Sequence, residues 1–413
     1  MRILILSQYF WPESFIINDL ARTLCEQGHK IVVATGKPNY PSGEVFAGYR
    51  SKGVQLDVFA GVIEVIRIPL RARGGGGARN LFLNYLSFVW SGLRWLPWLL
   101  RGREFDAIFV FCPSPITAAI PGIPLKWLKG AHLALWLQDL WPQSLEATGH
   151  VRSPLVRRIV GTMVRAIYAA ADTLLVQSRA FSAPVAEYAP VHKIVYYPNS
   201  VSAAAPLDGP AVLPPELVET LETQFCVVFA GNIGTAQSVE TIIDAAFLLR
   251  DLADAKIVLV GSGSRLDWVV QQVHERGLNN VIVAGRFPPS AMPDIYRRSA
   301  GLLVTLTAHE IFSFTIPSKV QAYLAAGRPI IASVNGEGAR VVADAGAGLT
   351  CAAEDASGLA QCVRALREMP EAERMRLGTN GARYFQEHFE MGRQAHRLIE
   401  ILEQRMAERN GEH

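Results

Sequence analysis

The chain has 413 residues, a formal net charge of +3, and hydrophobic side chains at half of its positions. This length predicts two domains, each with enough apolar residues for a core of its own. The small net charge and the lack of a basic stripe interleaved with aromatics argue against a nucleic-acid partner. The five cysteines have no metal-ligand spacing and their number is odd, which favours reduced thiols in a cytoplasmic protein.

The chain begins with an alternation of short apolar runs and helical patterns. Residues 2–7 form an apolar run, a polar loop with Glu13 follows, and residues 16–24 repeat at helical spacing before a second run at 31–35. This order predicts the βαβ unit of a doubly wound α/β domain, where ligands bind beyond the carboxyl ends of strands. Glu13 is therefore a candidate catalytic residue, and the alternative is an exposed loop glutamate.

The most apolar window runs from Leu81 to Leu100 and holds three tryptophans with arginines around it. Its polar residues and Pro97 argue against a membrane-spanning helix, although the length is nearly sufficient. Two interpretations stay open. The window is either a helix lying on the anionic inner leaflet of a membrane or a helix packed on the sheet.

Asp139 directly follows the apolar run 133–137, which predicts an inner strand. At the carboxyl end of such a strand, a carboxylate flanked by aromatics could act on a substrate hydroxyl. The alternative is that Asp139 caps the next turn. Further along, the Ala-, Pro- and Gly-rich stretch 201–215 predicts a linker between two domains.

Beyond the linker, apolar runs again lead into loops, and three of them end in glycine-containing turns. These turns begin at Gly231, Gly261 and Gly285, and a fourth run at 301–306 leads into the stretch 312–331. Each turn follows a strand and precedes a helix, so its backbone N–H groups can approach a phosphate closely. We expect these three turns and the loop after the fourth run to converge on one edge of a sheet.

The stretch 312–331 predicts a loop, a short helix and a strand. Pro317 suits the first helical turn, and Gly327 suits the position just past the helix end. Ser318 and Lys319 then stand at the helix N-terminus, where free N–H groups and the helix dipole attract an anion such as a diphosphate. The alternative is an ordinary capped helix with a solvated lysine.

Several motifs occur in a characteristic order along nearly the whole chain. They are Pro12-Glu13, Gln138-Asp-Leu-Trp-Pro142, Tyr197-Pro-Asn-Ser200, Phe229-Ala-Gly-Asn-Ile-Gly234, Val260-Gly-Ser-Gly263 and Pro317-Ser-Lys319 with Tyr323-Leu-Ala-Ala-Gly-Arg-Pro329. As an ordered set they resemble the retaining family 4 glycosyltransferases of GT-B fold. The resemblance is greatest to bacterial enzymes of the colanic-acid and O-antigen type, including L-fucosamine transferases.

The resemblance implies two Rossmann-like domains that face a cleft. Residues 1–205, with a returning helix at 391–413, would bind the acceptor, and residues 206–390 would bind the nucleotide sugar. Transfer would retain the anomeric configuration and need no metal and no cofactor. We expect a UDP-linked donor, with GDP and dTDP left open by the sequence, and a polyprenyl-diphosphate-linked saccharide acceptor. The enzyme would act in O-antigen, capsule or exopolysaccharide synthesis, as a cytoplasmic protein held peripherally at the inner leaflet through Leu81–Leu100.

The resemblance also assigns roles to particular residues. Asp139, Lys319 and Glu13 would carry the catalysis. The donor would be bound by residues on several loops: Gly231, Asn232, Gly234 and Gly261 at the diphosphate turns, Arg286 and Phe287 by the base, Glu310, Phe312 and Ser313 near the sugar, and Ser318 and Lys319 by the phosphates.

Some positions depart from the common family pattern. Many relatives carry two glutamates eight positions apart, where this chain has Phe314 and Ala322. Many also carry an arginine and a lysine on the diphosphate loop, where this chain has Asn232 and Gln237. The loss of a carboxylate at Phe314 suggests a 6-deoxy or N-acetylated donor sugar. The departures also leave two other functions open, a sugar-nucleotide 2-epimerase of GT-B architecture and a non-catalytic partner subunit.

Overall fold

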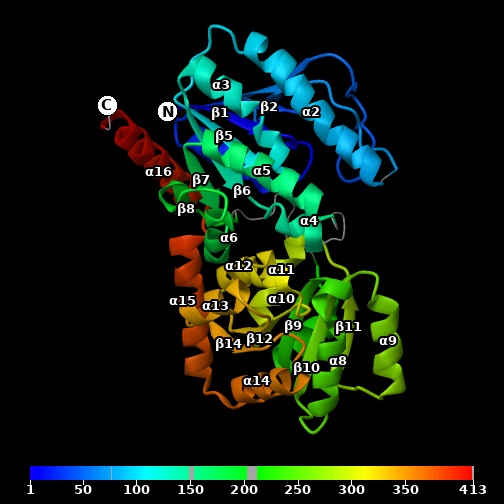
Figure 1. Cartoon of the computed structure of the whole chain (residues 1–413). Coiled ribbons are helices and arrows are strands. Elements are labelled where there is room, and N and C mark those ends of the chain that lie inside the picture. Colours follow the sequence, from blue (N-terminus) through cyan, green and yellow to red (C-terminus); the bar gives the residue numbers. More distant parts are fainter. Residues whose placement is uncertain (76, 148–152, 202–211, 412–413) are drawn as a thin grey trace. The chain divides into compact units, whose positions relative to one another are not determined.

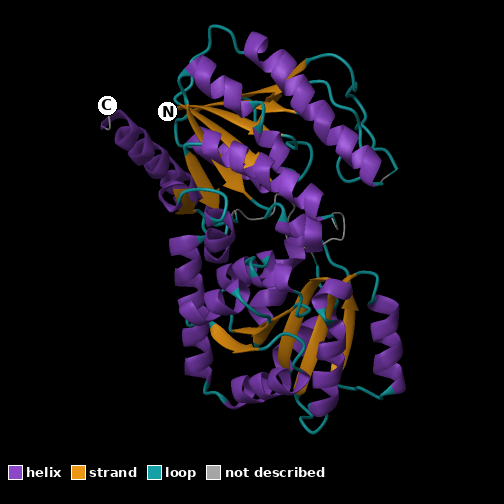
Figure 2. Cartoon of the chain, in the orientation of Figure 1, coloured by secondary structure: helices purple, strands orange, loops and turns teal. Residues whose placement is uncertain are grey.

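The chain is described here from a computed structural model that covers residues 1–75, 77–147, 153–201 and 212–411. It divides into two compact units, Met1–Ser202 with Met391–His413, and Ala203–Glu390. The expected domain boundary between residues 205 and 206 lies outside the described residues. Each unit is a parallel sheet covered by helices (Figures 1 and 2), which confirms the predicted α/β class with two doubly wound domains.

The described part of the N-terminal unit contains an eight-stranded sheet. Only the edge pair β3–β4 is antiparallel, and the other pairs run parallel. Its inner strands are buried on both faces, as their continuous apolar sequences predict. In sheet order the strands are β3 (Gln55–Phe59), β4 (Ile63–Arg67), β2 (Lys30–Thr35), β1 (Arg2–Ser7), β5 (Ala107–Cys112), β6 (His132–Leu137), β7 (Thr173–Val176) and β8 (Ile194–Tyr196).

Helices cover both faces of this sheet (Figure 2). They are α1 (Ile16–Glu26), α2 (Ala78–Leu99), α3 (Gly122–Lys129), α4 (Gln143–Ala147), α5 (Pro154–Ala170), α6 (Ser182–Ala186) and α16 (Met391–Gly411), with short 3-10 turns η1 (Ile116–Ala119), η2 (Arg179–Phe181) and η3 (Val191–Lys193).

The helix α16 returns from the end of the chain to complete the N-terminal unit, as the resemblance implied. Leu398 and Leu402 are fully buried in the same core as Leu20 of α1. The buried Tyr197 holds the helix in place, because its hydroxyl donates to the carbonyl oxygen of Gln394 at 3.0 Å. The motif that begins at Tyr197 therefore anchors this helix.

Helix α2 has one buried and one exposed apolar face. Phe88 and Leu96 are fully buried, whereas Phe82, Trp90 and Trp98 are exposed. The helix thus packs on the unit, as the second interpretation predicts, and it also presents aromatics to solvent, while docking on a membrane stays a prediction. No helix within the described parts of the chain is both long and apolar enough to cross a membrane.

The described part of the C-terminal unit, residues 212–390, holds a six-stranded parallel sheet. Its order is that of a dinucleotide-binding fold, and the strand order reverses between β9 and β12. Ligands bind such sheets beyond the carboxyl ends of the strands at this reversal. In sheet order the strands are β11 (Val281–Gly285), β10 (Ala255–Ser262), β9 (Phe225–Asn232), β12 (Gly301–Thr305), β13 (Ile330–Ser333) and β14 (Gly348–Cys351).

The connecting helices include the predicted short helix, α12. It begins at Ser318, one residue later than predicted, because Pro317 is extended and lies directly before the helix. Gly327 ends the helix with a left-handed φ of 65°, as predicted. The helices of this unit are α7 (Pro215–Thr223), α8 (Val239–Leu248), α9 (Leu266–Glu275), α10 (Met292–Arg298), α11 (Glu310–Ser313), α12 (Ser318–Ala326), α13 (Glu337–Asp344), α14 (Ala356–Glu368) and α15 (Glu371–His388), with 3-10 turns η4 (Thr235–Gln237) and η5 (Pro289–Ala291).

Candidate functional site

The carboxyl ends of β9 and β10 lie side by side, and paired glycines leave the backbone there without covering side chains. Gly261 pairs with Gly231, and Ser262 pairs with Asn232. A Cβ added to Gly261 would lie 1.8 Å from the carbonyl oxygen of Gly231, so only glycine fits there. The φ angles of Gly231 and Gly261, 134° and 146°, also require glycine. This turn therefore leaves backbone groups open to a ligand, as its sequence predicts.

Lys319 extends from the first turn of α12 across this glycine turn. A Cβ at Gly231 would lie only 2.6 Å from Lys319 Cε. The ammonium Nζ donates to Gln237 Oε1 at 2.8 Å and lies 3.7 Å from the centroid of the Phe229 ring. The structure thus brings together two of the predicted groups, the lysine and the glycine turn, and the alternative of a solvated lysine is wrong.

The Lys319 side chain is half-buried, and its ammonium has no negative partner among the described residues. Among the described residues no carboxylate forms an ion pair with it, and its partner Gln237 is neutral. Burial therefore lowers the pKa of Lys319 to about 7. An anion placed beside this nitrogen would restore the missing charge compensation and favour the protonated form.

Contacts that sequence reasoning missed fix α12 against β9 and η4 against β12. The buried Tyr323 hydroxyl accepts from the Ala230 N–H at 3.0 Å and donates to the Ala230 carbonyl at 3.3 Å. The backbone carbonyl of Gln237 accepts from Thr305 Oγ1 at 2.5 Å, which ties η4 to β12. Gln237 was noted only as a departure from a family pattern, and no local signal marks it as the partner of Lys319.

The other predicted donor residues lie on neighbouring loops of the same unit. A Cβ at Gly234 would lie 2.5 Å from Asn232 Nδ2, so these two residues are packed together in the glycine turn. Ser318 is exposed beside Lys319 at the start of α12. Arg286, exposed, and Phe287, half-buried, follow the edge strand β11, and Glu310, Phe312 and Ser313 belong to α11, where Glu310 is exposed and the other two are half-buried.

In the N-terminal unit, Glu13 is buried, so the alternative of an exposed loop glutamate is wrong. Its carboxylate accepts three backbone N–H groups, from Asn39 and Tyr40 at 2.8 Å each and from Phe10 at 3.2 Å. Burial raises the pKa of Glu13, while these donors and Arg67 act in the opposite direction. The geometry suits a residue that joins the loops after β1 and β2, and a role in catalysis stays a prediction.

Asp139 lies at the carboxyl end of β6, as predicted, and is half-buried. Its Oδ2 accepts from the Trp141 indole N–H at 3.2 Å. The carbonyl of the preceding Gln138 accepts from Gln177 Nε2 at 2.7 Å, so the loop is held to the next strand, β7. Asp139 therefore stands on a fixed loop at the edge where a substrate would bind this unit.

An aromatic cluster at the same sheet edge was not predicted. Tyr9 stacks on Phe15 with ring centroids 5.2 Å apart, and Tyr40 lies 5.8 Å from Tyr9. The guanidinium of Arg73 lies over both tyrosine rings, 5.8 Å from Tyr9 and 5.3 Å from Tyr40. A cation beside aromatic faces could bind a sugar and an attached phosphate.

Two doubly wound units, the first completed by a returning C-terminal helix and the second carrying a glycine turn at its sheet edge, are characteristic of the GT-B fold. Two family descriptions match this chain, "Glycosyl transferase 4-like domain" over residues 15–200 and "Glycosyl transferases group 1" over residues 224–368. The chain therefore has the GT-B fold and consists of two glycosyltransferase domains, the first of the 4-like type and the second of the group 1 type.

Individual relatives agree with this assignment. WcaI of Escherichia coli K12, assigned as a colanic acid biosynthesis glycosyl transferase, is 25% identical over 346 residues, which are 79% of this chain and 82% of WcaI. HepE of Anabaena, solved in complex with UDP, matches 98% of this chain and 100% of its own with a TM-score of 0.65 and 14% identity. Sucrose-phosphate synthase of Thermosynechococcus elongatus matches 98% and 99% with a TM-score of 0.70 and 16% identity.

We predict that Lys319 titrates near pH 7 in the folded protein. NMR of the lysine side chains would follow the titration, and Lys319→Met would identify the signal by removing it. The same pKa shift determines whether the stability of the fold rises or falls with pH. Because folding lowers this pKa from 10.5 to about 7, the wild type should gain stability relative to Lys319→Met as pH rises from 7 towards 10.5. A midpoint above pH 9 would contradict the prediction.

We also predict that Gly231→Ala displaces the lysine, because the new methyl group would lie 2.6 Å from Cε. The ammonium would return to water, and its pKa would move up from about 7. Gly277→Ala is the matched control, since Gly277 also has a positive φ, 60°, but a Cβ there meets no atom within 4 Å. An unchanged Lys319 titration in Gly231→Ala would show that the two residues are not in contact.

Proposed function

We propose that the protein transfers a sugar, with retention and without a metal, from a UDP-linked donor to a polyprenyl-diphosphate-linked saccharide. The observation that carries the proposal is the Lys319 ammonium, which lies across the glycine turn of β9 without a negative partner. A diphosphate would supply the missing charge. HepE binds UDP, and WcaI is assigned to colanic acid synthesis, which supports UDP as the nucleotide and a surface polysaccharide as the product.

In the proposed reaction, negative charge grows on the diphosphate as the bond to the sugar breaks. Lys319 and the N–H groups at Gly231–Gly234 would stabilise that charge. Asp139 would orient the acceptor hydroxyl, and the departing phosphate oxygen would take the proton of that hydroxyl. Glu13 would act indirectly, through the two loops that its carboxylate joins.

The donor sugar of the proposal is 6-deoxy or N-acetylated, with L-fucosamine as one candidate. Phe314 ends α11 and is half-buried, next to the residues proposed to lie near the sugar. A phenyl ring offers no acceptor for a sugar hydroxyl, so a fully hydroxylated sugar would lose hydrogen bonds there. A donor panel that showed preference for UDP-glucose would overturn this part of the proposal.

We predict that UDP raises the melting temperature of the full chain more than GDP or dTDP does, because a ligand of the folded state stabilises it. Lys319→Ala should lower release of UDP from the preferred donor by about 10²- to 10³-fold, the usual effect of removing one preorganised donor. Lys256→Ala, at the amino end of β10 in the same sheet, is the matched control. Wild-type turnover by Lys319→Ala, with its melting temperature unchanged, would remove Lys319 from the mechanism.

The acceptor proposal includes docking on the cytoplasmic leaflet through α2. Phe82, Leu86 and Trp90 are exposed at four-residue spacing on one face of the helix, and Trp90 is 73% exposed. Exposed arginines at positions 79, 94 and 101 accompany this face. Aromatics with flanking cations suit the interface of an anionic bilayer, where a lipid-linked acceptor would be found.

We predict that the full chain cosediments with vesicles containing phosphatidylglycerol and less with neutral vesicles. Trp90→Glu should weaken this binding, because it places a negative charge on the apolar face beside anionic lipid. Met375→Glu is the control, since Met375 is also exposed, at 62%, but lies on α15. Equal binding of both variants would mean that α2 does not contact the lipid.

A further inference from the structure

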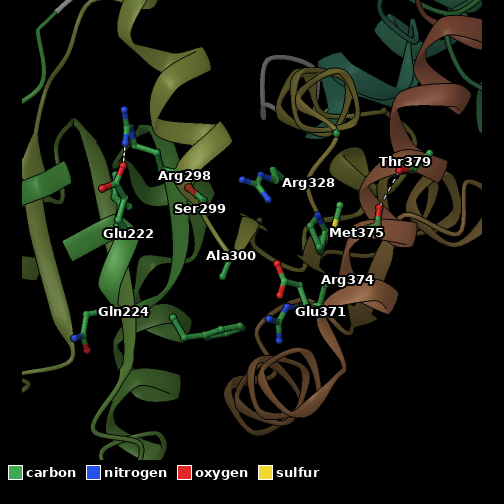
Figure 3. A pocket seen from close by; sticks show the side chains of 14 residues that line it. Glu222, Gln224, Arg298, Ser299, Ala300, Arg328, Glu371, Arg374, Met375 and Thr379 are labelled. Atoms are coloured by element: carbon green, nitrogen blue, oxygen red, sulfur yellow. Dashed lines mark hydrogen bonds and ion pairs between the residues drawn. The ribbon is translucent and has the colours of Figure 1, made fainter. Parts of the chain in front are cut away.

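A cavity of about 440 Å³ lies in the C-terminal unit at the amino end of its sheet. Phe225, where β9 begins, Ala300 before β12 and Pro329 before β13 line it, so it is at the opposite strand ends from the glycine turn. Figure 3 shows several charged side chains around this space, among them Arg298, Arg328 and Arg374. Its size is within the usual range for pockets that bind small molecules.

Most of the charges around the cavity are already paired. Arg298 forms ion pairs with Glu222 and with Asp294, the latter at 3.1 Å. Arg374 Nη1 donates to the carbonyl oxygens of Met369 at 2.8 Å and of Arg367 at 3.2 Å, so carbonyl groups fix the guanidinium, and no carboxylate within residues 212–411 forms an ion pair with it.

Arg328 and Glu371 have no polar partner. Across residues 212–411, which the structure describes without a gap, neither side chain makes a hydrogen bond or an ion pair. Arg328 is half-buried, and burial together with the charge of Arg297 lowers the pKa of its guanidinium. A partly desolvated guanidinium without an anion is unfavourable for the folded state unless a ligand supplies the charge.

The position of Arg328 is fixed by its neighbours. It follows Gly327, whose N–H donates to the carbonyl of Leu324 and so closes α12 without help from the arginine. Helix α15 crosses this point at very short range, because a Cβ at Gly378 would lie 2.1 Å from the carbonyl oxygen of Gly327. These contacts fix the backbone from which the Arg328 side chain extends to the cavity.

We propose that this cavity binds a small phosphorylated sugar. The guanidinium groups of Arg328 and Arg374 would bind the phosphoryl group, for which the planar fork of arginine is suited. Glu371 would accept a sugar hydroxyl, and the half-buried ring of Phe225 would lie against the sugar. The first turn of α15, which begins at Glu371, adds backbone N–H groups that favour an anion.

The alternative is that these arginines only balance the negative ends of the dipoles of α12 and α14. In that case the cavity would have no affinity for phosphate. The proposal itself does not depend on the donor sugar or on the acceptor, since none of its residues belongs to the glycine turn.

The test is calorimetric titration of the full chain with inorganic phosphate and with glucose 6-phosphate. We expect glucose 6-phosphate to bind the wild type, and to bind Arg328→Met about tenfold or more weakly, the effect of losing a charge-assisted pair of hydrogen bonds. Arg376→Met is the matched control, because Arg376 is an exposed arginine of α15 that does not line the cavity. Hydrogen exchange should show protection of residues 371–379 on binding.

Two results would overturn the proposal. One is that the wild type binds neither compound at millimolar concentration. The other is that Arg328→Met binds both as the wild type does, which would place any phosphate at the glycine turn instead. If Arg328→Met did not fold, as judged by its melting curve, Arg328→Gln would replace it, since glutamine keeps a polar group there without the charge.

Discussion

The absence of a side chain at Gly231 is the steric condition on which the candidate donor site depends. It allows the Lys319 stem to lie flat on the end of β9, so that the ammonium reaches Phe229 and Gln237. The cost is a charge held out of water beside a neutral amide, and this cost appears as the lowered pKa of the lysine. The site is thus arranged in advance around an anion, instead of being neutralised by the protein itself.

A comparable principle applies to the N-terminal unit, where buried polar groups join the loops at the carboxyl edge of the sheet. Glu13 connects the loops after β1 and β2 through backbone N–H groups. Arg67, which is fully buried at the end of β4, pairs with Asp57 and donates to the carbonyl oxygen of Trp11 at 2.5 Å. Networks of this kind make a loop edge rigid when nearly every member is satisfied, and this one includes Tyr40 of the aromatic cluster around Tyr9.

Much of this architecture could be predicted from the sequence, because buried parallel strands appear as continuous apolar runs and the turns carry glycine. The end of α12 at Gly327 and the glycine turn at Gly231 follow from such local signals. Strand β3 was not predicted, since it alternates exposed and partly buried residues and pairs only with β4. Nor could the burial of Glu13 be predicted, because its donors at Asn39 and Tyr40 are 26 and 27 residues away along the chain.

The same limit applies to Lys319 and Gln237, which are 82 residues apart in the sequence. Their contact exists only after β9, β12 and α12 have been assembled, so no local pattern encodes it. Sequence signals thus located the glycine turn and helix α12, whereas the partners that set the charge of the lysine required the tertiary structure.

The return of α16 has a consequence for the order in which the two units fold during synthesis. The core of the N-terminal unit includes Leu398 and Leu402, so these hydrophobic contacts can form only after α16 has left the ribosome. The C-terminal unit ends at Glu390 and has all of its core residues earlier. Although domains generally fold from the N-terminus onwards, in this protein the second unit can be finished first, while the first one waits with an incompletely covered sheet.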